Sequence, residues 1–504
     1  MGLLRRIFFC TFSVIYLIFC PLIILYALGI TFKPQTKTII KTGIIHINTA
    51  PSGASVYINN RKFSEKTPTT IRNLPPGDYS LKLALNNYQP WEKTISVAEE
   101  KNTNIDHVIL IPTVWDTRTI AETPFENLIP VLGKPFLLLN TQMALKDLFV
   151  YRIEEGLGKT LLEDFKPGDQ PATEKLQPLF KTDFLHREGR IRRYFTMNNS
   201  PFLLLEVDLS EKYKYLWADL RPEEIIVHDI TDLFPAVPDD VKWDPKDPHI
   251  LLAMQDKSIN RLDIESMAIY PKITSDTVGF ALFDKKIYIL TKNHILKRLD
   301  ADGKNPHVLL GKSQLNSKLL GEQDQWKIYV LDQEIIILIN QEGSLLFNQP
   351  PYFLVDQDVK NFVFDENLQR LLIWTNSKIG VIDFVPKNTK PSDLKTPQLT
   401  WLVNNAQEID QAFWVNKGSH ILYKDAGRIF LVEAFDPSEQ SSPYEITEVK
   451  KQSAIAYFDT TGTIFYLNRK TERLSSLTIL PSSEGSIFPQ FKKDQTTQAG
   501  QNAF

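Results

Sequence analysis

An irregular unit that recurs along most of this chain leaves it very few possible folds. In each copy an aromatic residue opens an apolar run, a polar turn follows, and a second apolar run with branched residues comes next. The aromatic positions that mark the copies are Phe195, Trp243, Phe283, Trp326, Phe364, Trp414 and Phe458. Successive positions lie 38 to 50 residues apart. A small unit repeated at such a spacing builds a repeat architecture, because one unit cannot bury its apolar face alone.

The length of the unit is typical of a sheet of four short strands, since propeller blades run to about 40–50 residues. The second half of several copies closes as a strand that ends in an acidic residue, as at Asp263, Asp300 and Asp383. This pattern resembles the β-propellers of the TolB and WD40-like groups. We predict an all-β fold, with a β-propeller of about seven or eight blades over residues 115–480. Two packed β-sandwiches are the alternative, and the lack of amphipathic helical runs disfavours an α/β fold.

A long uncharged segment stands near the start of the chain. Residues 7–32 contain no charged side chain. As a helix they would span roughly 39 Å at a rise of about 1.5 Å per residue, and the hydrocarbon core of a bilayer is about 30 Å thick. A cleaved signal peptide has a shorter apolar core than this. The segment therefore predicts an uncleaved transmembrane signal-anchor helix, with the lipid bilayer as its partner.

Two arginines, Arg5 and Arg6, stand directly before this segment and predict its orientation. Basic residues mark the cytoplasmic side of a membrane span. We expect residues 1–6 to be a basic cytoplasmic stub and 33–41 to be a linker, with the bulk of the chain outside the cytoplasm. The tail at 481–504 is polar and is expected to be disordered.

The chain contains two cysteines, Cys10 and Cys20, and both fall inside the apolar segment. The remainder therefore has no disulfide, no cysteine-based metal site and no catalytic thiol. A large β-repeat region without disulfides is held together by burial of its core.

Residues 42–112 show the alternation that is typical of short β-strands. Ile45 and Ile47 alternate with polar neighbours in one run, and Leu81 and Leu83 do so in a later one. Clusters of Pro, Gly, Asn and Asp separate the runs. A period of two residues with frequent turns predicts a small β-sandwich.

The same module carries an ordered series of short motifs. They are Pro51-Ser52-Gly53-Ala54, then Thr67-Pro68, then Leu74-Pro75-Pro76-Gly77-Asp78-Tyr79, then Tyr88-Gln89-Pro90-Trp91. The series resembles the PEGA domain family, although Ser52 replaces the Glu of the Pro-Glu-Gly-Ala turn and Asn87 replaces a Gly before the Tyr. Ser and Asn are both accepted in turns. The resemblance implies an extracytoplasmic module of cell-envelope proteins, which agrees with the predicted anchor.

We expect the motif residues to have structural roles. Glycines take positive φ in tight turns, prolines fix φ where strands begin and end, and the aromatic residues fill a small core. The residues concerned are Pro51, Gly53, Ala54, Thr67, Pro68, Pro76, Gly77, Tyr79, Tyr88 and Trp91.

Motifs for catalysis or for bound ions do not form in this sequence. The Gly-Lys-Thr of residues 158–160 has Ile153 where a phosphate-binding loop needs a glycine. The turn at 300–305 has Arg298 and Leu309 where a calcium loop needs acids. No histidine pair has the helical spacing of a zinc site. We predict no catalytic residue, no cofactor and no metal.

The formal charge of −3 argues against a nucleic-acid partner, because domains that bind nucleic acid are normally basic. The sequence favours a membrane-anchored, extracytoplasmic binding or scaffold protein of the cell envelope, whose propeller meets a protein or glycan. A propeller enzyme, either a glycan hydrolase or a lyase, is the alternative. Such an enzyme would show paired carboxylates about 5–10 Å apart with strongly shifted pKa values in the propeller channel.

Overall fold

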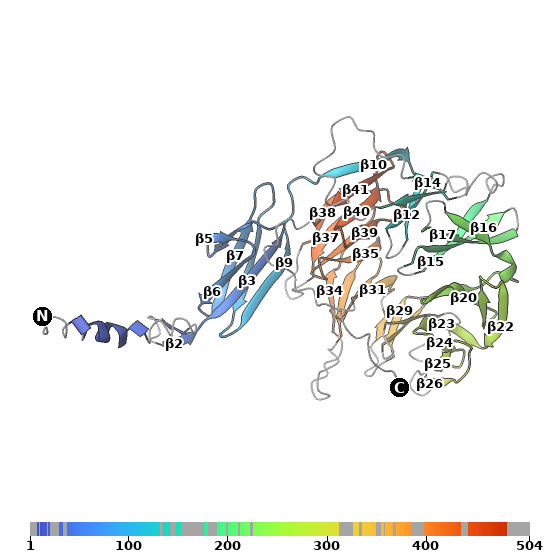
Figure 1. Ribbon diagram of the computed structural model, residues 1–504, viewed down its shortest axis with the longest axis horizontal. Coiled ribbons are helices and arrows are strands. Elements are labelled where there is room, and N and C mark those ends of the chain that lie inside the picture. Colours follow the sequence, from blue (N-terminus) through green and yellow to red (C-terminus); the bar gives the residue numbers. More distant parts are fainter. Residues whose placement is uncertain are drawn as a thin grey trace, which may run out of the picture. The chain divides into compact units, whose positions relative to one another are not determined.

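The computed structural model (Figure 1) describes most of the chain and divides it into two compact units. One unit is Met1–Val114 with Leu480–Phe504, and the other is Trp115–Ile479. The described residues are 8–9, 11–17, 19–20, 30–33, 38–131, 135–141, 148–153, 176–179, 189–197, 200–209, 212–221, 225–311, 326–331, 335–348, 354–356, 358–365, 369–384, 398–434 and 442–480.

The N-terminal region differs from the prediction at its C-terminal boundary. Residues 8–9, 11–17 and 19–20 are helical, but β1 (Ile30–Lys33) and β2 (Thr38–Lys41) form an antiparallel pair. The predicted helix was therefore wrong at residues 30–32, which are strand, and the predicted linker at 33–41 contains the strand β2. Isoleucine, threonine and phenylalanine favour extended backbone, and both strands are rich in them.

In the part of the chain that the structure describes, no helix combines the length and the apolar character needed to cross a membrane. The flanking Arg5 and Arg6 lie outside the described residues, as does the tail at 481–504.

The predicted small β-sandwich is built from two sheets. The first has the order β6-β3-β9 and the second β5-β4-β7-β8. Their strands are β3 (Gly43–Ala50), β4 (Ser55–Ile58), β5 (Arg61–Lys66), β6 (Thr69–Leu74), β7 (Gly77–Ala84), β8 (Trp91–Val97) and β9 (Asn102–Ile109). Alternate residues of the strands meet in one buried core, which includes Ile45, Ile47, Val56, Leu81 and Leu83. The period of two residues thus places one face of each sheet inside.

The unit Trp115–Ile479 consists of short antiparallel strands, which confirms the predicted all-β class. Its first half contains β10 (Thr117–Pro124), β11 (Asn127–Pro130), β12 (Phe136–Asn140), β13 (Leu148–Arg152), β14 (Leu176–Pro178), β15 (Arg190–Thr196), β16 (Phe202–Leu209), β17 (Lys212–Asp219), β18 (Ile226–Asp229), β19 (Asp240–Asp244), β20 (Asp247–Gln255), β21 (Ser258–Asp263), β22 (Ala268–Thr274), β23 (Thr277–Phe283), β24 (Lys286–Thr291), β25 (Leu296–Asp300) and β26 (His307–Leu310). A short 3-10 helix, η4 (Thr231–Leu233), follows β18.

The second half of this unit continues in the same way. Its strands are β27 (Trp326–Val330), β28 (Ile336–Asn340), β29 (Ser344–Phe347), β30 (Leu354–Asp356), β31 (Asn361–Asp365), β32 (Arg370–Trp374), β33 (Ile379–Asp383), β34 (Gln398–Val403), β35 (Ile409–Val415), β36 (His420–Asp425), β37 (Arg428–Glu433), β38 (Tyr444–Glu448), β39 (Ala456–Phe458), β40 (Thr463–Leu467) and β41 (Arg473–Thr478). Among the described residues, β10–β41 form eight sheets of four strands each.

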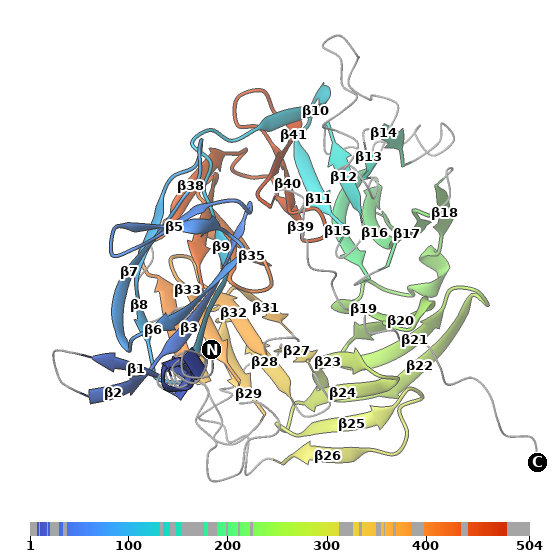
Figure 2. The same ribbon diagram turned by 60° about the vertical axis from the view of Figure 1, so that its left-hand side comes forward.

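The eight sheets follow one another around a common centre (Figure 2). Seven hydrophobic clusters of described residues each join two consecutive sheets. The first of these junctions lies between the sheet that contains β10 and the sheet β11–β14, and the last lies between the sheets β31–β34 and β35–β38. At the eighth junction, Phe413 of β35 and Tyr457 of β39 lie with ring centroids 6.3 Å apart. Sheets that pack face to face in a ring are the arrangement of a β-propeller, so the alternative of two packed sandwiches does not apply.

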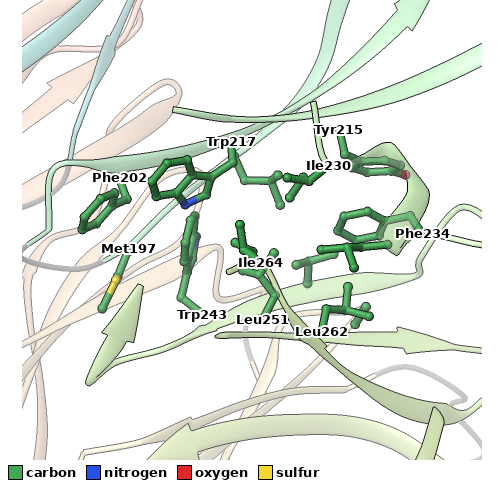
Figure 3. Packing of buried hydrophobic residues seen from close by; sticks show 14 residues of the cluster. Met197, Phe202, Tyr215, Trp217, Ile230, Phe234, Trp243, Leu251, Leu262 and Ile264 are labelled. Carbon is green, nitrogen blue, oxygen red and sulfur yellow. The ribbon is translucent and has the colours of Figure 1, made fainter. Parts of the chain in front are cut away.

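One of these clusters shows how two sheets share a core (Figure 3). Phe202 and Trp217, from the β15–β18 sheet, stack with ring centroids 5.3 Å apart. They meet Trp243, Leu251 and other buried residues of the β19–β22 sheet. Because each sheet buries both faces against its neighbours, its central strands are apolar on nearly every residue, as in β16 and β24.

The last sheet combines strands from both ends of the unit. Its order is β10-β41-β40-β39, so β10 pairs with strands that follow it by more than 300 residues. The antiparallel register joins Thr117 with Leu477, Arg118 with Ser476, and Thr119 with Ser475. This pairing links the beginning of the repeat region to its end and covers the edge of β41.

Gly279 on β23 lies very close to the backbone of β27. A Cβ atom at Gly279 would stand 2.1 Å from the carbonyl oxygen of Trp326. We expect Gly279→Ala to lower the free energy of unfolding by about 1–3 kcal/mol, because the two strands must separate to admit the methyl group. Urea unfolding followed by tryptophan fluorescence measures this change, and an unchanged midpoint would show that these strands do not approach each other.

Candidate ligand-binding site

The first half of the PEGA-like motif series closes one turn of the small sandwich around Thr67. The Thr67 hydroxyl accepts a hydrogen bond from the Ala54 amide at 3.0 Å, and its carbonyl accepts one from the Gly53 amide at 2.7 Å. The Thr67 hydroxyl also lies 2.6 Å from the Thr49 hydroxyl. The Thr49 hydroxyl in turn donates a hydrogen bond to the Pro51 carbonyl. Ala54 and Thr67 are buried, and Gly53 has a φ of +93° that favours glycine.

The second half of the series supports the sandwich core. Tyr79 donates a hydrogen bond from its hydroxyl to the Pro75 carbonyl at 2.7 Å. The side chains of Tyr79, Tyr88 and Trp91 pack partly buried against the core. Gly77 has a φ of +150° at the start of β7, directly after the half-buried Pro76. The other residue of the set, Pro68, follows a cis peptide bond and is exposed. These positions shape the turns and the core of the sandwich.

The first strands of the propeller sheets lie nearest its centre, and charged side chains from them cross between sheets. Lys242 of β19 donates from Nζ to the carbonyl oxygens of Phe280, at 2.5 Å, and Ile328, at 3.3 Å. It therefore reaches past the β23–β26 sheet to the β27–β30 sheet. Its ammonium group also lies 5.7 Å from the ring centroid of Tyr329, and burial lowers the pKa of Lys242. Lys242 and Tyr329 therefore occupy this part of the inner region.

Buried or half-buried cations tie neighbouring sheets together elsewhere in the ring. Lys424, whose side chain is 2% exposed, donates to the carbonyl oxygens of Lys451 and Ser453 and to the carboxylate of Asp410. Arg370 similarly donates to the carbonyl oxygen of Ala434 at 2.9 Å. Hydrogen bonds from charged donors are stronger than neutral ones, so these ties stiffen the ring.

The carboxylates were the test of an enzymatic channel. Among the described residues, the carboxyl groups with shifted pKa values all have lowered values: Asp229, Asp263, Asp300, Asp302 and Glu408. For Asp300 the main cause is a hydrogen bond from Lys286. A general acid of glycoside hydrolysis needs a raised pKa instead.

A buried carboxylate forms the centre of the most elaborate polar cluster in the part of the propeller that the structure describes. Glu206 on β16 is 0% exposed. Its Oε1 accepts a hydrogen bond from Arg192 at 3.1 Å, and its Oε2 accepts two from Arg193, at 3.0 and 2.5 Å. The Tyr215 hydroxyl donates to Oε2 at 3.1 Å. A buried charge is tolerated when it is paired and hydrogen-bonded in this way.

The two arginines of the cluster have different tasks. Arg193 also donates to the carbonyl oxygens of Pro238 and Asp239, at 2.9 and 3.4 Å, and so joins its sheet to the segment before β19. Burial lowers its pKa, but the hydrogen bond and charge of Glu206 outweigh this and leave the pKa above its ordinary value. Burial and the Glu206 charge raise the pKa of Tyr215, so its hydroxyl stays a donor.

Arg192 projects toward solvent from the same cluster. Its side chain is 47% exposed, and its guanidinium lies 4.7 Å from the ring centroid of Tyr213, which is 36% exposed. One guanidinium nitrogen is held by Glu206, and among the described residues the other two have no partner. Arg190, on the same strand β15, is exposed. Arg190, Arg192 and Tyr213 form what we call the arginine site.

Sequence reasoning did not identify the arginine site. Its visible signals were the run Arg190-Ile191-Arg192-Arg193 and the single acid in Leu203-Leu204-Leu205-Glu206-Val207. A charge inside an apolar strand calls for a partner, but the sequence does not show which residue supplies it.

Sites for metal or phosphate do not emerge from the described residues. They contain no group of three or more His, Cys, Asp or Glu side chains that could hold a metal ion. The turn at 300–305 is closed by its own hydrogen bonds, with Asn305 donating to Asp300 at 2.7 Å. The Gly-Lys-Thr of residues 158–160 lies outside the described residues.

Several solved structures share features of this fold at low sequence identity. The C-terminal WD40 domain of Sif2 is 11% identical, with a TM-score of 0.46, and the match covers 72% of this chain and 98% of that one. The β-propeller domain of Cps50 (Swd1) from Myceliophteria thermophila is 11% identical, with a TM-score of 0.35, and covers 57% and 96%. Hsv2 from Kluyvelomyces marxianus is 9% identical, with a TM-score of 0.34, and covers 56% and 95%.

The small sandwich matches a known protein family. No curated protein sequence matches this chain. Residues 42–110 match the model of the PEGA domain. The resemblance seen in the turn and strand motifs is thus confirmed, and the chain carries a PEGA domain before its β-propeller.

Proposed function

We propose that this protein is a membrane-anchored, extracytoplasmic binding or scaffold protein of the cell envelope. In this proposal the PEGA domain is a stalk, and the eight sheets are the eight blades of a propeller that binds an envelope protein or glycan. The observation that carries the proposal is the occurrence in one chain of the uncharged segment 7–32 and the PEGA match at 42–110.

Membrane anchoring is compatible with the strand β1. Residues 7–29 precede this strand, and as a helix they would measure roughly 35 Å, against a hydrocarbon core of about 30 Å. Arg5 and Arg6 favour a cytoplasmic N-terminus, which puts the PEGA domain and the propeller on the other side of the membrane.

A binding role is supported by the construction of the propeller. Cations such as Lys242, Arg370 and Lys424 fix neighbouring sheets to one another. A rigid frame lowers the entropy lost when side chains on its surface meet a ligand. The half-exposed side chains of the arginine site are placed on such a frame.

Labelling of single cysteines tests the proposed topology. The experiment replaces Cys10 and Cys20 by serine and introduces either Asp302→Cys, in an exposed turn of the propeller, or Gly2→Cys, in the N-terminal stub. In spheroplasts, a membrane-impermeant maleimide is expected to label Asp302→Cys at once and Gly2→Cys only after lysis. Labelling of Asp302→Cys only after lysis would contradict the proposal, as would recovery of the chain outside the membrane fraction.

A further inference from the structure

We propose that the arginine site binds the carboxylate of an acidic sugar, a uronic acid residue of an envelope polysaccharide. This inference rests on the proposed function and names the class of ligand. It identifies Arg192 as the residue that meets the carboxylate, Arg190 as a second cation beside it, and Glu206 as the residue that positions Arg192.

Arg192 is held in place before any ligand arrives. Glu206 accepts a hydrogen bond from one of its terminal nitrogens, and the Tyr213 ring lies against its guanidinium plane. Glu206 is itself fixed by Arg193 and Tyr215. An exposed arginine normally loses much rotamer freedom on binding, and this arrangement has already removed part of that cost.

The fixed Arg192 keeps a donor edge for a ligand. Two of its three guanidinium nitrogens have no partner among the described residues, and neither does the side chain of Arg190. A guanidinium edge with two parallel N–H groups matches the two oxygens of a carboxylate. Glu206 pairs with both Arg192 and Arg193, so its single negative charge leaves this group of three side chains with one net positive charge.

The surroundings of the arginine site favour one kind of molecule as the carrier of the carboxylate. The exposed large apolar side chains of this sheet are Tyr194, Tyr213 and Ile226. The core of a stable protein–protein interface is mostly apolar, although arginine and tyrosine are enriched in it. The few exposed apolar side chains of this sheet offer little for such a core, whereas a guanidinium beside a tyrosine ring matches a small polar ring with one acid group. The hydroxyl of Tyr213, which has no partner among the described residues, adds a hydrogen-bonding group.

The test measures binding of the full chain, in detergent, to polygalacturonate and to fully methyl-esterified polygalacturonate by calorimetry. The two polymers share one backbone and differ in charge. We compare the parent with Arg192→Gln and Arg192→Lys. The matched control is Arg261→Gln on the neighbouring sheet, because Arg261 also lies over a tyrosine, Tyr270 at 5.3 Å, but pairs with no buried carboxylate in the described part of the chain.

The parent is expected to bind polygalacturonate and to bind the ester at least about tenfold more weakly. Arg192→Gln should lose at least about tenfold in affinity and Arg192→Lys less, since lysine keeps the charge but not the planar fork. Arg261→Gln should bind like the parent. The melting temperature of each variant, measured in parallel, shows whether it is folded, and Glu206 keeps its hydrogen bonds from Arg193 and Tyr215 in all of them.

The proposal is overturned if the parent does not bind polygalacturonate, or if Arg192→Gln and Arg261→Gln bind it equally well. It is also overturned if poly-L-glutamate binds as tightly, since the site would then recognise acidic peptides. The membrane topology measured by cysteine labelling does not depend on any of these binding results. Failure of this inference is therefore distinguishable from failure of the proposed function.

Discussion

A propeller that begins at Phe125, and therefore lacks β10, is expected to unfold far more easily than one that begins at Trp115. β10 supplies the outer strand of the last sheet, and four of its residues pair with β41. At about 1 kcal/mol for each lost pairing, the free energy of unfolding should fall by at least about 4 kcal/mol. Urea unfolding followed by circular dichroism measures the difference.

The shorter protein should also associate with itself. Removal of β10 exposes the edge of β41, and an exposed edge is a template for pairing with another chain. Size-exclusion chromatography with light scattering is expected to show a monomer for the chain from Trp115 and larger species for the chain from Phe125. Equal stability and equal size for the two proteins would contradict the closure of the ring by β10.

Replacement of Glu206 by alanine is the second change with a large expected effect. The substitution leaves Arg193 and the Tyr215 hydroxyl without their buried acceptor. Removal of one partner from a buried hydrogen-bonded cluster costs about 1–3 kcal/mol, and we expect the upper end of this range because several donors lose the same acceptor. Glu206→Gln should cost less, since the amide oxygen still accepts hydrogen bonds.

An exposed ion pair provides the control for this prediction. Glu448 pairs with Arg469 at 2.7 Å, and both side chains are about half exposed. Glu448→Ala should change the free energy of unfolding by at most about 1 kcal/mol. If Glu206→Ala proved as mild as Glu448→Ala in urea unfolding, Glu206 would not be the buried centre of the cluster.

The sequence predicted the repeat well because the repeating residues have a common structural position. Each of the seven aromatic positions, from Phe195 to Phe458, falls on the first strand of a sheet, namely β15, β19, β23, β27, β31, β35 and β39. Aromatic side chains at this position pack between consecutive sheets, as Trp243 does. A requirement repeated in every sheet leaves a period in the sequence.

The sheet β11–β14 escaped this reasoning. Its first strand, Asn127–Pro130, contains no aromatic residue, and the aromatic side chain beside it is Phe125, which lies before the strand and is buried. The pairing of β10 with β41 also left no local sign, since pairing partners far apart in the chain share no motif. Local patterns report local structure, and ring closure is a long-range property.

The boundary of the apolar segment was wrong for a different reason. Hydropathy counts Ile30 and Phe32 as suitable for a membrane helix, yet the same residue types favour strands. Pairing with Thr38–Lys41 decides between the two, and that partner lies beyond the segment. The arginine site was missed because it depends on which strands are neighbours: Glu206 meets Arg193 through the pairing of β15 with β16.

The proposed function depends on one architectural claim, that residues 115–479 form a single ring closed between β10 and β41. Cross-linking tests it directly, because the propeller has no cysteine of its own. In a chain with Cys10 and Cys20 replaced by serine, the paired positions are Arg118→Cys with Ser476→Cys, and Thr119→Cys with Ser475→Cys. Adjacent antiparallel strands bring paired Cα atoms to about 4.5–5.5 Å, within reach of a disulfide.

Mild oxidation followed by mass spectrometry is expected to find a disulfide in at least one of these two pairs. The control joins Arg118→Cys to Thr463→Cys on β40, which is not a neighbour of β10, and should form none. The closed ring predicts a disulfide in a paired variant and no disulfide in the control. Reduced cysteines in both paired variants, or equal cross-linking in the control, would contradict it.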